Sequence, residues 1–184
     1  MFAGGANPTA ASPNNAKNTQ FVEIATLGDA QEFGELSEVR RAMFACASST
    51  RGIFAGGLNP ADIDTIEFIT IATKGNTTDF GDLINHARLT ASLSSSVRGI
   101  IGGGYSPSNV IQYTNISSSG GMNDFGDLFR RTEFGNAGAS NNTRGLFLSG
   151  YYTLNRIDFI TIATLGDSAD FGNMSSRFYG NACS

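Results

Sequence analysis

Pairs of acidic residues around a Phe-Gly dipeptide are the first feature of the sequence that could do chemistry. Residues 79–82 and 124–127 both read Asp-Phe-Gly-Asp, which places two carboxylates three residues apart. The Asp-Phe-Gly triplet holds magnesium in protein kinases, but the lysine strand and catalytic loop of those enzymes are missing here. The spacing also lacks the dense oxygen ligands of a calcium loop. We therefore predict acids that accept backbone amides, with metal binding at these turns as the alternative.

The other reactive residues do not make a catalytic or cofactor site. Residues 102–104 are three glycines, but they lack the lysine and the strand-to-helix context of a phosphate-binding loop. His86 is the single histidine, so a histidine triad, a histidine-rich zinc site and a multi-histidine copper centre are excluded. We expect no enzyme activity and no cofactor.

The two cysteines, Cys46 and Cys183, occupy equivalent positions of an internal repeat. Leu93 and Ala139 hold the same position elsewhere, which indicates an apolar packing site. Equivalent atoms of neighbouring repeats usually lie too far apart for a disulfide, so we predict free thiols.

The Phe-Gly motif recurs along the whole chain and divides it into repeats. Its phenylalanines lie 47, 45 and 46 residues apart, at Phe33, Phe80, Phe125 and Phe171. An Arg-Gly dipeptide is the second anchor, at Arg51, Arg98 and Arg144. Periods of this length are typical of solenoids and propellers. We place the repeats at 1–50, 51–97, 98–143 and 144–184 of a single repeat domain.

Recurrence at fixed positions favours structural roles for these residues. We expect the four phenylalanines to fill the space between sheets, and the glycine after each of them to form a turn that other residues cannot adopt. We expect Arg51, Arg98 and Arg144 to bond carbonyls or a repeat aspartate near the turns.

Each repeat is expected to form three or four short strands, because no helical period of apolar residues is sustained. The strand near residues 66–72 carries Phe68 on one face and Ile69 and Ile71 on the other. Burial of both faces indicates a sheet packed between neighbours. We predict an all-β fold, a β-propeller of four repeats, with a stacked solenoid as the alternative.

The ends of the chain allow two versions of this fold. Residues 181–184 match 44–47, and residues 1–5 match 53–57. The four units therefore either close into one ring or belong to a longer array. In an open arc, exposed strand edges and apolar faces need cover from further repeats or other chains.

Composition narrows the range of partners. A formal charge of −4 and a pI near 4.9 disfavour a surface that neutralises phosphates, so we expect no nucleic acid partner. No run of 18 apolar residues occurs, and we expect no targeting segment and no membrane insertion.

Recognition is expected in the segments that differ most between repeats, which follow the Gly-Gly strand. Variable loops on a rigid frame commonly carry binding function, and exposed Tyr and Asn suit carbohydrate or protein surfaces. Solvated turns without a ligand are the alternative. The candidate binding residues are Asn14, Asn15, Lys17, Asn59, Tyr105, Tyr151, Tyr152, Asn155 and Arg156.

Three repeated segments carry a family resemblance. They read Phe-Ile-Thr-Ile-Ala-Thr-x-Gly, Asp-Phe-Gly-Asp-Leu and Ser-Ser-Thr-Arg-Gly-x-Phe-x-Gly-Gly. Together they resemble the kelch-like repeats of tailed-phage virion proteins, in particular those of marine and cyanobacterial phages, and the resemblance covers all four units. It implies a kelch-like propeller in a fibre, tail or capsid-decorating component, with a role in host attachment.

The resulting hypothesis is a non-enzymatic virion module that binds other virion proteins, further copies of itself or a host-surface glycan. A cell-surface adhesin or lectin-like propeller is the main alternative. An enzyme on a propeller scaffold is a third, and it would need a cluster of perturbed acids in the central channel.

Overall fold

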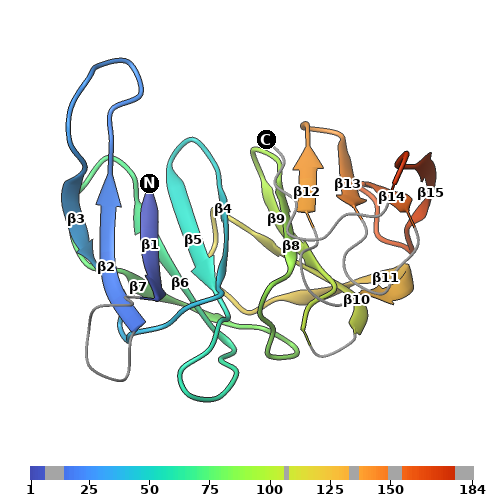
Figure 1. Cartoon of the computed structure of the whole chain (residues 1–184), viewed down its shortest axis with the longest axis horizontal. Helices are drawn as coiled ribbons and strands as arrows, with labels where there is room; N and C mark the ends of the chain where they lie inside the picture. The colour runs from blue at the N-terminus through green and yellow to red at the C-terminus, as the bar shows by residue number, and fades with distance from the viewer. Residues whose placement is uncertain (7–14, 106–107, 133–136, 149–154, 177–184) are drawn as a thin grey trace.

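The computed structural model describes residues 1–6, 15–105, 108–132, 137–148 and 155–176. Within these ranges the chain forms 15 β-strands in four antiparallel sheets, and it forms no helix (Figure 1). The prediction of an all-β fold is therefore confirmed.

The sheets follow one another along the chain, and within each sheet the strands are hydrogen-bonded in sequence order. The first sheet contains β1 (Phe2–Ala6), β2 (Asn15–Phe21) and β3 (Gln31–Glu35). The second contains β4 (Phe44–Ala47), β5 (Arg51–Ala55), β6 (Thr65–Thr70) and β7 (Thr78–Asp82). The third contains β8 (Ala91–Ser94), β9 (Arg98–Gly102), β10 (Ser108–Asn115) and β11 (Asn123–Thr132). The fourth contains β12 (Ala137–Ser140), β13 (Arg144–Leu148), β14 (Arg156–Thr161) and β15 (Ala169–Asn173).

Every sheet after the first begins with a strand that the sequence repeat assigns to the preceding unit. Strand β4, for example, lies at the end of repeat 1–50 but pairs with β5. These opening strands contact one another from sheet to sheet, β4 with β8 and β8 with β12. Among the described residues the first sheet has three strands, so the row of opening strands ends at β4.

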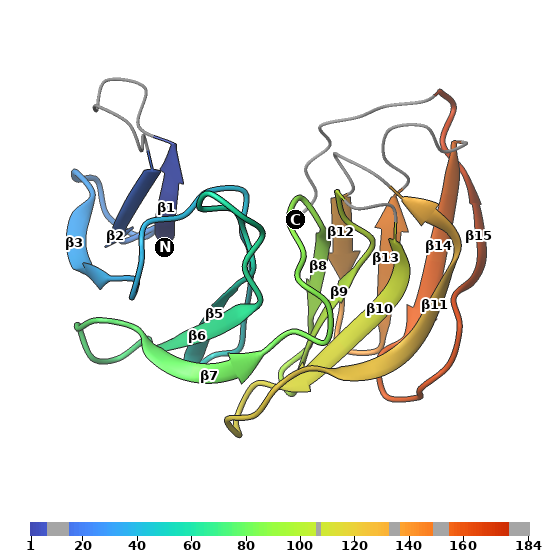
Figure 2. The ribbon, with the colours of Figure 1, turned by 90° about the horizontal axis from the view of Figure 1, so that it is seen from below.

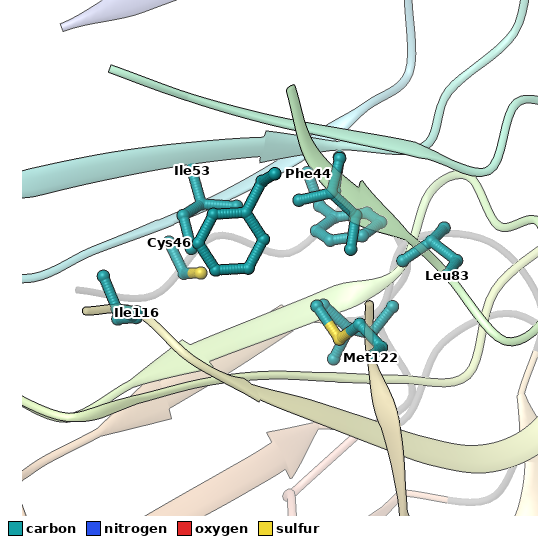
Figure 3. Close-up of a cluster of buried hydrophobic side chains, with 10 residues drawn as sticks. Phe44, Cys46, Ile53, Leu83, Ile116 and Met122 are labelled. Atoms are coloured by element: carbon teal, nitrogen blue, oxygen red, sulfur yellow. The ribbon is translucent and has the colours of Figure 1, made fainter. Parts of the chain in front are cut away.

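The long middle strands are buried on both faces. On β6 the adjacent residues Ile66 and Glu67, which point to opposite faces, are 0% and 2% exposed. Both faces are covered because the sheets pack against one another. Figure 3 shows the cluster between the second and third sheets, where Phe44, Cys46 and Ile53 meet Ile116 and Met122.

The Phe-Gly dipeptide lies inside a strand at a β-bulge. In the second sheet Ile66 pairs with Gly81 and Glu67 with Asp79, so the pairing skips Phe80. The first, third and fourth sheets shift register at the same repeat position. The predicted turn is therefore wrong, because a bulge meets the need for a glycine, at φ 139° for Gly81, without ending the strand.

The four sheets stand side by side in an open row. Figure 2 shows the first sheet at one end of the row and the fourth at the other. Each adjacent pair encloses a buried apolar cluster. The described sheets thus form a series of equivalent junctions and do not close into a ring.

Candidate functional site

The bulged phenylalanine of each sheet packs edge-on against an aromatic residue of the neighbouring strand. The ring centroids of Phe68 and Phe80 are 5.9 Å apart, with the ring planes at 74°. Rings in this T-shaped arrangement attract each other beyond simple burial. The same pair recurs as Phe21–Phe33, Tyr113–Phe125 and Phe159–Phe171.

Two arginines of the Arg-Gly anchor join neighbouring sheets. The guanidinium of Arg51 lies 4.4 Å from the ring centroid of Phe68, and its Nη1 donates to the carbonyl of Ile116 in the next sheet at 3.2 Å. Each arginine therefore combines a cation–π contact with a charge-assisted hydrogen bond across a junction. Arg98 repeats both contacts one sheet further on, with Tyr113 at 4.8 Å and the Ile162 carbonyl at 2.6 Å.

The outermost sheets depart from this pattern. Arg144 lies 5.0 Å from the centroid of Phe159 and is exposed, and no carbonyl among the described residues accepts from its guanidinium. In the first sheet the place over the ring of Phe21 is taken by Lys74 of the second sheet, at 4.7 Å.

Main-chain atoms of neighbouring sheets meet beside each internal bulge. The amide of Gly120 donates to the carbonyl of Phe80 at 2.7 Å. A Cβ built on Gly81 would lie 2.6 Å from the carbonyl carbon of Gly120, closer than real Cβ atoms come. Only glycine fits at this position. Gly75 with Phe33 and Gly166 with Phe125 make the same bond at the other two junctions.

A buried ion pair fixes the link between the first and second sheets. Arg40 donates to the Glu67 carboxylate and to the carbonyls of Gly56 and Thr65. Burial lowers the pKa of the Arg40 guanidinium, and Glu38 opposes this effect. The other Glu67 oxygen accepts from the Ser37 amide at 2.9 Å. Gln112 takes the place of Glu67 in the third sheet and accepts from Ile84 at 2.8 Å, so the position serves structure.

Cys46 is a free, buried thiol in the cluster of Figure 3. Burial raises its pKa to about 12, so the thiol is protonated at neutral pH and is a poor nucleophile. Its Sγ faces Gly99 of the next sheet, where a Cβ would approach it to 2.5 Å. Cys183 lies outside the described residues.

The candidate binding residues are spread over all four sheets. Asn14, Tyr151 and Tyr152 lie outside the described residues, and Asn15 begins β2. Lys17 also lies in β2 and not in a loop, and its ammonium group forms an ion pair with the Glu35 carboxylate of β3 at 2.6 Å.

The remaining candidates also make contacts within the chain. The Asn59 amide donates to the carbonyl of Ala61. Asn155 donates to the carbonyl of Met174, and Arg156 pairs with Asp158 and Asp170. Asn59 and Asn155 are thus held by contacts of their own segments, whereas Arg156 lies in β14 and not in a loop.

Tyr105, another candidate, lines a pocket. It is 37% exposed, and the guanidinium of Arg88 lies 3.8 Å from its ring centroid. Arg88 itself pairs with Asp62 at 3.1 Å, so the cation that contacts the tyrosine ring is held in place. The pocket holds about 230 Å³ and is lined by Asn85, His86, Ala87, Gly103, Gly104, Tyr105, Ser108 and Gln112.

Sequence reasoning missed most of this pocket. His86 and Asn85 belong to the link between the second and third sheets and come close to Tyr105 only through folding. The sequence did contain one sign of the pocket. The position of His86 carries Val39, Arg131 and Arg177 in the other repeats, and such variation is typical of residues that bind ligands.

A larger cavity of about 730 Å³ opens between the first and second sheets. Its walls are mainly apolar and include Phe21, Phe33, Cys46, Gly52 and Ile53. It lies beside β4, the first of the opening strands among the described residues.

Within the described ranges, no group of three or more His, Cys, Asp or Glu side chains is placed to hold a metal ion. No helix long and apolar enough to cross a membrane occurs in those ranges. Comparison with models of known families and with curated proteins finds no match to this chain.

Proposed function

We propose that this chain is a non-enzymatic β-propeller module of a bacteriophage virion that binds a host-surface glycan. The virion half rests on the resemblance of the repeats to kelch-like arrays of tailed phages. The propeller half is supported by four antiparallel sheets packed face to face, with their opening strands in contact from sheet to sheet.

The observation that carries the binding function is the Tyr105 pocket. The recurring Phe, Arg and Gly residues hold sheets together, whereas Asn85 and His86 of this pocket lie at positions that carry other residues in the other repeats. A rigid frame with variable side chains at its loops is a common arrangement for recognition.

The chemistry of the pocket suits a sugar. Tyr105 offers a flat apolar ring with a polar edge, on which a sugar ring can stack. Asn85 and Ser108 supply uncharged donors and acceptors for hydroxyl groups. The volume of about 230 Å³ lies below the ~300–1,000 Å³ of pockets for drug-sized ligands, which fits a single sugar residue.

A glycan array probed with the labelled chain tests the binding half. We expect binding to a neutral glycan, and we expect Tyr105→Ala to weaken it by about tenfold or more, since truncating an aromatic anchor commonly costs above ~1.4 kcal/mol. Ser96→Ala, at the other end of β9, is the control and should bind as the parent does. Equal binding by the parent and Tyr105→Ala would rule out this pocket as the site.

Mass spectrometry of purified phage particles tests the virion half. Peptides of this chain are expected in the particles. Their absence from particles, together with detection on a cell surface and glycan binding, would instead support the lectin-like adhesin.

A further inference from the structure

The two ends of the row of sheets expose surfaces that are buried at the internal junctions. We define the leading face by Phe2, Val22 and Ile24 of the first sheet, and the trailing face by Arg144, Phe159 and Phe171 of the fourth sheet. Figure 2 shows that these sheets stand at opposite ends of the row.

The leading face is apolar and open to solvent. Phe2 is 61% exposed, whereas its repeat counterparts Phe54, Ile101 and Phe147 are 5%, 1% and 4% exposed. Ile24 is 98% exposed, whereas Ile116 and Ile162 are 0% and 2% exposed. The counterpart in the second sheet, Ile71, which no repeat arginine of the described residues faces, is exposed, at 41%.

The trailing face carries the same kinds of residues that cover the leading-face positions of the next sheet at the internal junctions. Phe171 is 51% exposed, whereas Phe33, Phe80 and Phe125 are 6%, 2% and 3% exposed beneath the next sheet. Arg144 corresponds to Arg51 and Arg98, which donate to the carbonyls of Ile116 and Ile162. On the leading face, the carbonyl of Ile24 occupies the repeat position of those two carbonyls.

The main-chain bonds of the junctions also have counterparts at the two ends. At the third junction the Gly166 amide donates to the Phe125 carbonyl, and the Asp127 amide donates to Oδ1 of Asp167. By repeat position, the matching groups are the Gly28 amide and the Asp29 carboxylate on the leading face, and the Phe171 carbonyl and the Asn173 amide on the trailing face.

We propose that the trailing face of one copy binds the leading face of a second copy of this chain. The internal junctions show what covers each face, namely the other face of the same repeat. Because the two faces differ, the contact is heterologous, and copies join head to tail into a ring or an extended row. This inference is independent of glycan binding.

Light scattering coupled to size-exclusion chromatography of the 184-residue chain tests the contact. We expect species larger than 19.3 kDa that dissociate on dilution. Ile24→Asp damages only the leading face and Phe171→Asp only the trailing face, and each should weaken association at least tenfold. Val97→Asp is the control, because Val97 is 52% exposed but lies in the turn between β8 and β9.

Mixing the two variants separates head-to-tail association from other kinds. The Ile24→Asp chain keeps its trailing face and the Phe171→Asp chain keeps its leading face, so the mixture should form one dimer of twice 19.3 kDa and nothing larger. Circular dichroism checks that each variant is folded. Arg144→Glu, which changes an exposed side chain, replaces Phe171→Asp if that variant unfolds.

Three results would overturn the proposal. The first is a parent chain that stays monomeric up to its solubility limit. The second is an Ile24→Asp or Arg144→Glu chain that associates as strongly as the parent, because every head-to-tail contact uses both faces. The third is a mixture of folded variants that remains monomeric.

Discussion

Arg40 and Glu67 form an ion pair whose two side chains are 0% and 2% exposed, at the link between the first and second sheets. Removing one partner leaves a buried charge without its counter-ion, which commonly costs about 3–5 kcal/mol. We therefore expect Glu67→Gln to lower the free energy of unfolding by about that amount in urea titrations.

The next repeat lacks both charges of this pair, because Ala87 and Gln112 occupy the same two positions one sheet further on. The repeat therefore folds with the pair replaced, and the net contribution of the pair has to be measured. In a double-mutant cycle, we expect Arg40→Ala and Glu67→Gln to be coupled by about 1 kcal/mol or more. Strictly additive losses would show that the pair contributes no net interaction.

The approach of Gly99 to Cys46 predicts a second pair of variants. Gly99→Ala would bring a Cβ to 2.5 Å from Sγ of Cys46. Overpacking of this kind typically costs about 1–3 kcal/mol, which thermal or urea unfolding measures. In a Cys46→Ala background the penalty should largely vanish, because the clashing atom is gone. Gly28→Ala, which meets nothing within 4 Å, is the control and should be close to neutral.

Two arginines of the same repeat position should differ in their contribution to stability. Arg98 donates to the Ile162 carbonyl at 2.6 Å, and hydrogen bonds to charged groups contribute about 1.5–3 kcal/mol. We expect Arg98→Met to lower the free energy of unfolding by an amount in this range. Arg144→Met should change it little in dilute, monomeric protein, because Arg144 is exposed. Equal losses would contradict the role assigned to the carbonyl.

The buried thiol of Cys46 predicts a pH dependence. Its pKa is raised from 9.0 to about 12 in the folded chain, so above pH 9 the unfolded chain releases a proton that the folded chain keeps. This contribution to stability is complete below pH 9 and is lost as the pH rises toward 12. Urea unfolding midpoints should fall more steeply above pH 9 in the parent than in Cys46→Ala. Parallel curves would contradict the raised pKa.

Periodicity made most of the fold predictable. The recurring Phe80 and Arg51 positions mark where sheets meet, and a period reveals such positions without any other protein for comparison. The bulge at Phe80 was not predictable, because a glycine with positive φ satisfies either a turn or a bulge, and only pairing with β6 decides between them.

Features that occur in a single repeat could not be predicted, because a period reveals only positions that recur. Arg40 has Ala87 as its counterpart, so the repeat gives no sign of a buried charge there. The Tyr105 pocket joins residues from two different segments, and His86 enters it only because the link between sheets folds against β10. Lys17 was placed in a loop because its strand has the polar composition of one.

The contact of Gly81 with Gly120 has a consequence for how such chains change in evolution. Neighbouring sheets meet there through main-chain atoms, which are the same whatever side chains the rest of the repeat carries. A unit gained or lost by recombination between repeats therefore finds a matching docking surface on both sides. Lineages can lengthen, shorten or shuffle the array while each unit diverges at its loops, so copy number and binding specificity are free to change separately.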